Sequence, residues 1–180
     1  MRLLEGESLD LTEARRTTIR LWQEEWSRGV RPGEIAKGLW TKSLIPDLKV
    51  WLDAPGELTY HTSQVLSGHG QFQTYMVKIG KSDGDVCVLC DSRETDDVVH
   101  TVLRCSALRE VRAHAPAVIQ GKSIPEMVGH MLTDRGAWRE TSSWLDAVMV
   151  AKEEKERERR ARFGPTRLPG AEAGQEETRH

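Results

Sequence analysis

The window Cys87-Val88-Leu89-Cys90, followed by His100 and Cys105, contains every cysteine of the chain and places one histidine between them. Its spacing is C-x2-C-x9-H-x4-C. Three thiolates and one imidazole form a complete tetrahedral ligand set for Zn²⁺ and leave no position for water or substrate. The window therefore predicts a structural zinc site in a protein that binds rather than catalyses, with the ligands Cys87, Cys90, His100 and Cys105.

Three other interpretations of the cysteines are open. A redox-active C-x-x-C pair opens a helix in a βαβ unit, and no strand-rich pattern precedes Cys87. A disulfide leaves one cysteine over, in a chain whose first residues carry acids where a secretory signal needs an apolar stretch. Three unrelated buried thiols are the last interpretation, because free cysteine is a common core residue. Ligand number, type and spacing together favour zinc.

The composition indicates an intracellular protein with a thin core. The 180 residues are 38% hydrophobic and 30% charged, and no apolar run reaches the 18 residues that a membrane span needs. The formal net charge of −2 gives no overall attraction to phosphate. The segment from Asp83 to Cys105, which contains the zinc window, is acidic, since its only bases are Arg93 and Arg104. Its acids are Asp83, Asp85, Asp91, Glu94, Asp96 and Asp97.

Outside the window the sequence predicts a mainly α fold, a small helical domain built around one structural zinc knuckle. Asp10 and Glu13 have the spacing of a capping box, and a helix over 11–28 follows. Residues 29–43, with three glycines and a proline, are expected to form a connector. Further helices are expected over 46–52, 58–67, 72–79, 98–105, 106–115 and 125–132, before a long C-terminal helix and a disordered tail.

Helical periodicity assigns side chains to faces. Trp22 and Trp26 continue a four-residue repeat and are predicted to be core anchors. In the last helix Trp138, Thr141, Leu145, Val148 and Lys152 are placed on one face. The mixed-charge tract 152–162 is interpreted as a solvated, projecting helix end.

Two histidines of the middle region are interpreted from their positions. His100 and Cys105 are separated by about 140° around an ideal helix, so the helix is expected to distort or stop near Cys105. His69 lies between two glycines and is interpreted as a turn residue.

Four segments are expected along the chain. Residues 1–56 form a Trp-rich helical connector, and residues 57–116 a helical segment that contains the zinc knuckle at 87–105. Residues 117–163 form C-terminal helices, and residues 164–180, dominated by Pro, Gly, Ala and Glu, form the disordered tail.

The order of motifs adds a resemblance. The chain runs from Leu21-Trp22-Gln23-Glu24-Glu25-Trp26 through 44–52 and 62–75 to the zinc window and an Arg-containing helix over 108–112. This order resembles the C-terminal region of the reverse transcriptase of non-LTR (LINE-type) retrotransposons of arthropods. In that family a Trp-rich connector precedes a segment close to Gln-x-Leu-x-Gly-His-Gly-x-Phe-x-x-Tyr and a Cys-Cys-His-Cys knuckle. The resemblance covers about residues 18–113.

The resemblance implies a parent enzyme that copies RNA into DNA at a chromosomal target, and so a nuclear location. A polymerase needs carboxylates that hold metal ions near the primer end, in a short aromatic-x-Asp-Asp turn between strands. The chain's Asp96-Asp97 follows Glu94-Thr95 within the zinc loop and lacks that context. The chain is therefore expected to be the accessory end of such an enzyme, without catalytic residues of its own.

The leading hypothesis is a zinc-containing domain that binds RNA or single-stranded DNA weakly and without sequence preference, with the remainder of a reverse transcriptase as a further partner. The contacts are assigned to Lys37, Lys42, Lys49, Lys78, Lys81, Arg104, Arg109 and Arg112. The alternative is a zinc-stabilised structural or protein-interaction module, in which zinc replaces a core too small to fold alone. A zinc hydrolase is disfavoured, because the fourth protein ligand closes the site.

Overall fold

The structure, a computed structural model, describes residues 10–28 and 38–164, and these ranges are mainly helical. They contain one isolated antiparallel bridge, between Val86 and Thr95, and no strand. The predicted mainly α fold and long C-terminal helix are thus confirmed. The elements are α1 (Leu11–Ser27), α2 (Leu39–Leu44), α3 (Leu48–Leu52), α4 (Tyr60–Ser67), α5 (Gln73–Lys78), η1 (His100–Arg104), η2 (Ser106–Leu108), α6 (Arg109–Ala113), α7 (Ile124–Met131) and α8 (Arg135–Phe163).

Several sequence predictions need correction or lie outside the described ranges. Part of the predicted connector is the helix α2, and Pro46 lies ahead of α3, which Asp47 caps. The expected helix 106–115 is divided into the 3₁₀ turn η2 and the shorter α6. Residues 29–37 of the connector and residues 165–180 of the predicted tail lie outside the described residues.

Side-chain caps fix the starts of the longer helices. Asp10 accepts hydrogen bonds from the first-turn amides of α1, as predicted, whereas Glu13 pairs with Arg16 instead of closing a capping box. Ser123 and Glu126 form a complete capping box at α7. Asp134 accepts from two backbone amides at the start of α8. These caps satisfy amides that have no partner within the helix.

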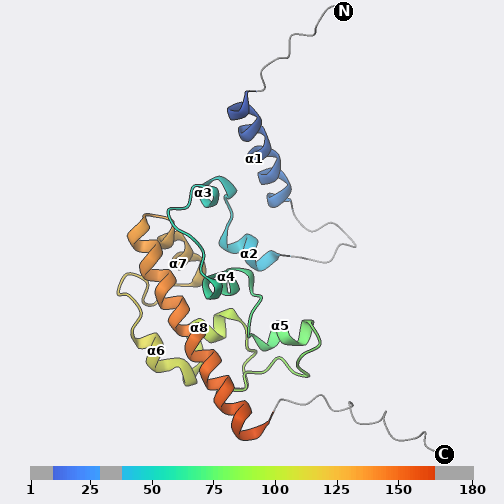
Figure 1. Ribbon diagram of the computed structural model, residues 1–180, viewed down its shortest axis with the longest axis vertical. Helices are drawn as coiled ribbons and strands as arrows, with labels where there is room; N and C mark the ends of the chain where they lie inside the picture. The colour runs from blue at the N-terminus through green and yellow to red at the C-terminus, as the bar shows by residue number, and fades with distance from the viewer. Residues whose placement is uncertain (1–9, 29–37, 165–180) are drawn as a thin grey trace, which may run out of the picture.

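Helix α8 organises the fold. It has 29 residues and runs along the body of the molecule beside α4, α6 and α7 (Figure 1). The five residues that the sequence places on one face of this helix are all buried, namely Trp138, Thr141, Leu145, Val148 and Lys152. Gly56 sits against this helix, because a Cβ atom there would lie 2.2 Å from the Trp138 ring. The apolar core therefore forms between α8 and the segments that precede it.

Three tryptophans act as anchors through their indole N–H groups. Trp26 donates to the carbonyl of Ile45, Trp40 to that of Val65, and Trp138 to that of Glu57. Each indole joins two segments while its ring contributes apolar contact.

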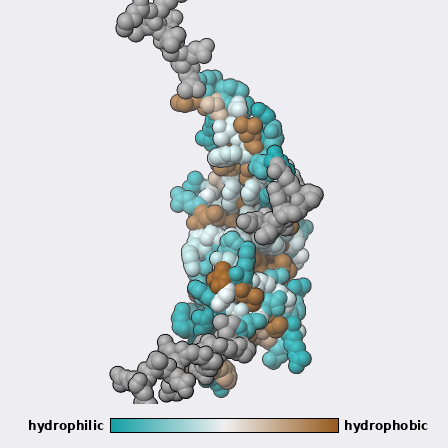
Figure 2. Space-filling model, turned by 90° about the vertical axis from the view of Figure 1, so that its right-hand side faces the viewer, coloured by the Kyte–Doolittle hydropathy of each residue, from teal (hydrophilic) through white to brown (hydrophobic). Residues whose placement is uncertain are grey.

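The prediction that Trp22 is a core anchor is wrong. Helix α1 has no buried residue, and Trp22 is 56% exposed. The helix stands at one end of the molecule, where Figure 2 shows apolar residues in brown on the surface. It is attached through Trp26 and through Gln23, whose amide donates to the Pro46 carbonyl and accepts from the Leu48 amide. Helix α3 packs against α1 and partly buries Trp26, but within the described residues Trp22 is left exposed.

A buried ion pair joins α8 to the metal loop, the segment from Cys87 to Cys105. The Lys152 amine lies 2.8 and 2.7 Å from the two carboxylate oxygens of Asp96, and both side chains are almost fully buried. The Asp96 carboxylate also accepts hydrogen bonds from the Thr101 hydroxyl and from the backbone amide of Gln73. Glu156 lies one turn beyond Lys152, and burial raises the pKa of its carboxyl against the opposing effect of Lys152. The start of the tract 152–162 is thus part of the core, which corrects its interpretation as a solvated end.

Removing one charge of this pair is expected to destabilise the protein. Lys152→Met leaves the Asp96 carboxylate buried without its cation, which costs about 3–5 kcal/mol of the free energy of unfolding. Urea unfolding of the metal-loaded chain measures the loss. Lys155→Met, at an exposed position one turn away, is the matched control and should change stability by less than about 0.5 kcal/mol.

The double variant Lys152→Met with Asp96→Asn removes both charges and should lose less stability than Lys152→Met alone. Equal stability of Lys152→Met and Lys155→Met would show that the buried ion pair contributes nothing.

Candidate metal centre

The metal loop is folded back on itself by backbone hydrogen bonds. The Cys87 amide donates to the Glu94 carbonyl at 2.9 Å, and the Asp96 amide donates to the Asp85 carbonyl at 2.7 Å. Arg93 adopts a left-handed conformation with φ of 56°, which lets the chain reverse. The two halves of the loop are therefore held side by side, with Cys87 and Cys90 at one end.

A π-helical turn aligns the other two ligands. In η1 the Cys105 amide donates to the His100 carbonyl at 2.7 Å, five residues earlier. This hydrogen bond brings Cys105 and His100 to the same side of the turn, whereas an ideal α-helix would separate them widely around its axis. The distortion expected near Cys105 is thus a widened helical turn.

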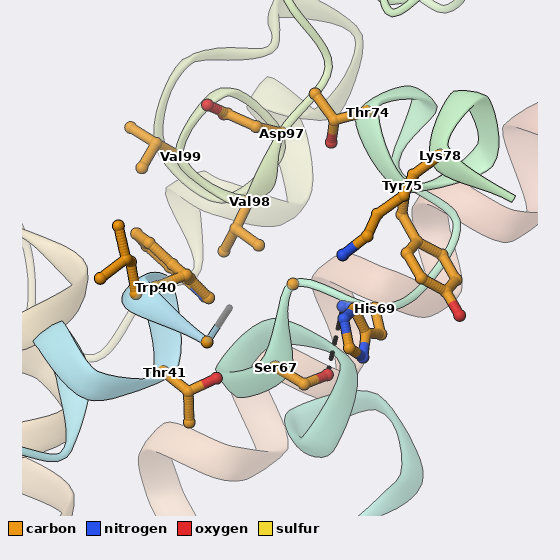
Figure 3. Close-up of a pocket in the computed structure, with 13 residues that line it drawn as sticks. Trp40, Thr41, Ser67, His69, Thr74, Tyr75, Lys78, Asp97, Val98 and Val99 are labelled. Atoms are coloured by element: carbon orange, nitrogen blue, oxygen red, sulfur yellow. Dashed lines mark hydrogen bonds between the residues drawn. The ribbon is translucent and has the colours of Figure 1, made fainter. Parts of the chain in front are cut away.

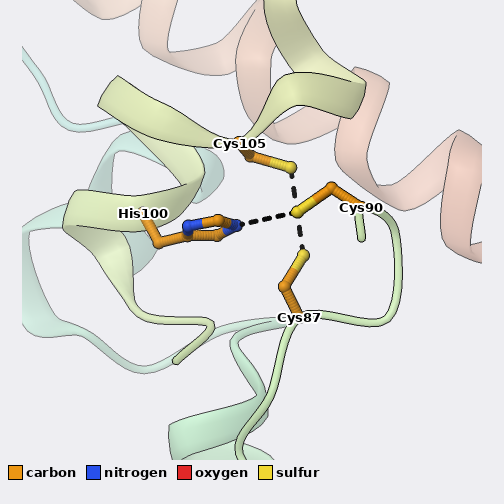
Figure 4. A group of neighbouring side chains, drawn as sticks. All are labelled: Cys87, Cys90, His100 and Cys105. Carbon is orange, nitrogen blue, oxygen red and sulfur yellow. Dashed lines mark hydrogen bonds between the residues drawn. The ribbon is translucent and has the colours of Figure 1, made fainter. Parts of the chain in front are cut away.

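The four predicted ligands converge. One side-chain atom from each of Cys87, Cys90, His100 and Cys105 lies within 4.8 Å of every other. The Cys87 and Cys105 sulfurs are 3.9 Å apart, and the Cys90 sulfur is 3.4 Å from Nε2 of His100 (Figure 4). Cys90 is half-buried and the other three are buried. The group could hold one metal ion.

Proton affinities in the group are uneven. A hydrogen bond with Cys105, and then burial, raises the pKa of the Cys87 thiol. The same hydrogen bond lowers the pKa of Cys105. Burial acts to lower the pKa of His100, but hydrogen bonds with the cysteines outweigh it and the pKa rises. A metal ion must displace these protons, so acidification opposes metal binding.

Two residues that the sequence did not suggest as parts of the site support the ligands. Glu94 lies 3.4 Å from Nδ1 of His100, which directs Nε2 toward the cysteine sulfurs. Arg104 holds Glu94 from the other side, with its Nε at 3.1 Å. The only sequence signal for Glu94 was an acid six residues before the histidine. Arg112, half-buried, donates to the Cys105 carbonyl and fixes the end of the loop.

The residues predicted to contact nucleic acid fall into two groups. Arg104 and Arg112 already bind within the metal loop, as described above. Arg109 on α6 is exposed, as are Lys78 and Lys81 at the end of α5. Lys37 lies outside the described residues, and Lys49 pairs with Asp53.

Comparisons of the chain with protein-family models, with curated proteins and with solved structures found no match. Over residues 10–28 and 38–164, none of the helices combines the length and apolar character needed to traverse a lipid bilayer.

Glu94→Ala is expected to weaken metal binding about 10- to 100-fold, because it frees the His100 ring to rotate and removes the acceptor of its Nδ1 proton. Titration with Co²⁺, followed by the absorption of its thiolate complex, measures the affinity. Asp91→Ala removes an exposed acid from the same loop and should leave the affinity unchanged. If the two variants lose affinity equally, the effect is one of loop charge and not of ligand orientation.

Proposed function

We propose that the four ligands hold one Zn²⁺ in a structural role. With Zn–S bonds of about 2.3 Å, the edge of a tetrahedral site is about 3.8 Å. The Cys87 and Cys105 sulfurs are 3.9 Å apart, so little movement is needed to accept the ion. Thiolate and imidazole ligands suit zinc. Four protein ligands leave no open position for a reacting water, which supports a structural rather than a catalytic metal.

The purified chain is expected to carry one Zn²⁺, and Cys105→Ser is expected to weaken its binding; native mass spectrometry measures both.

Chelation of the metal should raise amide hydrogen exchange across residues 86–112, because structural zinc contributes on the order of 10 kcal/mol, comparable with the folding free energy of a small domain. Helix α1, which packs on α3 and has no buried residue, provides the internal control and should not change. Equal increases in exchange in both regions would contradict a local role for zinc.

We further infer that this zinc-stabilised domain binds single-stranded nucleic acid, as the accessory C-terminal part of a LINE-type reverse transcriptase acting in the nucleus. The order of sequence motifs is the observation that carries this proposal. The electrostatics support it, because one of the six acids between Asp83 and Cys105 is neutralised by a base from outside that segment: Asp96 by Lys152. The acidic loop therefore repels phosphate less than its sequence suggests.

The domain is proposed to have no catalytic activity of its own. Asp96, half of the chain's Asp-Asp pair, is buried against Lys152 and accepts two further hydrogen bonds. This arrangement supports the proposal, because a carboxylate so engaged is a poor ligand for a catalytic Mg²⁺.

Arg109→Ala is expected to weaken binding of a fluorescein-labelled single-stranded RNA, because Arg109 is an exposed base beside the metal loop. Titrations at several salt concentrations should show a slope of log affinity against log salt that is flatter by about 0.7 for the lost phosphate contact. Arg15→Ala, at an exposed position on α1, is the matched control. If Arg109→Ala binds RNA with the same salt slope as the wild type, Arg109 does not contact the phosphate.

A protein-interaction module is the second candidate function, and α1 is the observation that favours it. Leu11, Leu21 and Trp22 are all exposed on this helix. An apolar protein contact there would be insensitive to salt, whereas phosphate binding weakens steeply as salt rises. The same salt series therefore separates the two candidates.

A further inference from the structure

A pocket of about 490 Å³ lies beside the metal loop (Figure 3). Four segments that are distant in sequence line it: the start of α2, the turn after α4, helix α5 and the chain that enters η1. Its volume is in the range of pockets that bind small organic groups.

One wall of the pocket is apolar and firmly held. Trp40 contributes its ring, which is fixed by the indole hydrogen bond to the Val65 carbonyl at 2.8 Å. Val98, which is buried, lies beside Trp40 on the segment that leads to the metal ligands (Figure 3). Gly68 has a φ of 69°, and a Cβ atom there would lie 3.3 Å from the Trp40 ring. A side chain at this position would narrow the pocket and strain the turn.

The other wall carries an aromatic pair and a cation. The His69 ring stacks on Tyr75 with centroids 4.7 Å apart and planes at 29°. The His69 amide donates to the Ser67 hydroxyl, which fixes the turn. The Lys78 amine points into the pocket beside His69 (Figure 3), and within the described ranges it has no ion-pair partner. His69 is thus more than the turn residue that its position between glycines suggested.

We propose that this pocket binds an unpaired base of a single-stranded nucleic acid, with the base stacked on the His69–Tyr75 pair and the adjoining phosphate at Lys78. The inference rests on the proposed nucleic-acid function and names its site. Aromatic faces accept every base, which gives binding without sequence preference. A lysine beside a stacked base suits the phosphate that is joined to that base through a sugar, because the lysine ammonium is a compact charge with three donors.

The metal loop builds part of this pocket. The Asp97 carboxylate accepts from the His100 amide at 2.7 Å, and Val98 and Val99 follow directly. These three residues line the pocket while the next one binds the metal. Residues 97–99 of the zinc knuckle therefore form one wall of the proposed pocket, while His69, Tyr75 and Lys78 lie outside the knuckle.

The test uses the zinc-loaded full chain and two labelled RNA strands of equal length, one intact and one with abasic positions. His69→Ala should weaken binding of the intact strand about tenfold, because one stacked base is lost, and should leave the abasic strand unaffected. His69→Phe, which keeps an aromatic face, should restore most of the affinity. Lys78→Met should weaken binding of both strands and flatten the salt slope by about 0.7.

His114→Ala and Lys155→Met, at exposed positions outside the pocket, are the matched controls and should bind as the wild type does. If the wild type binds neither strand, the proposed function and this inference both fall. If it binds, but His69→Ala and Lys78→Met match the controls, the function stands and the pocket assignment is overturned. Equal wild-type affinity for intact and abasic strands also overturns it. Should His69→Ala fail to fold, the Lys78→Met result and the abasic comparison still decide.

Discussion

The rest of this structure depends on one buried charge pair, Asp96 with Lys152. Asp96 lies in the metal loop, and its carboxylate is bound by the helix α8 through Lys152, by η1 through Thr101 and by α5 through the Gln73 amide. Its backbone carbonyl accepts from Thr74 as well. A buried charge is tolerated only when it is paired and hydrogen-bonded, so few other arrangements of these segments satisfy it. Three helical elements are fixed relative to the loop by a single side chain.

The metal centre and this ion pair act on the same short segment from opposite ends. The four candidate metal ligands close the loop from Cys87 to Cys105 on one side. On the other side Asp96 fastens it to the core. Glu94 supports the metal ligands, because it orients His100 and is itself paired with Arg104. Two acids that the sequence suggests as part of a repulsive surface, Asp96 and Glu94, therefore stabilise the loop.

Local patterns in the sequence predicted the parts of the structure that depend on local rules. The four ligands follow from spacing, the buried face of α8 from helical period, and the start of α1 from the cap at Asp10. What failed depends on distant partners. Periodicity placed Trp22 on a face but could not show whether a neighbour covers it. Charge alone suggested solvent for Asp96 and Lys152, because a sequence does not reveal that two ions 56 residues apart meet. The stacking of His69 on Tyr75 depends on the conformation of the turn between α4 and α5, which local patterns did not reveal.

The position of α8 in the chain has a consequence for biosynthesis. All four ligands precede residue 106, whereas the helix that covers them begins at Arg135. On a ribosome the ligand set is therefore complete before Lys152 has been added, and for that interval Asp96 has no counter-ion. A metal ion bound at this stage would keep the loop folded, so that α8 could pack against it once synthesised. In this order of synthesis a bound metal ion would stabilise the loop first, and the ion pair between Asp96 and Lys152 would complete the fold.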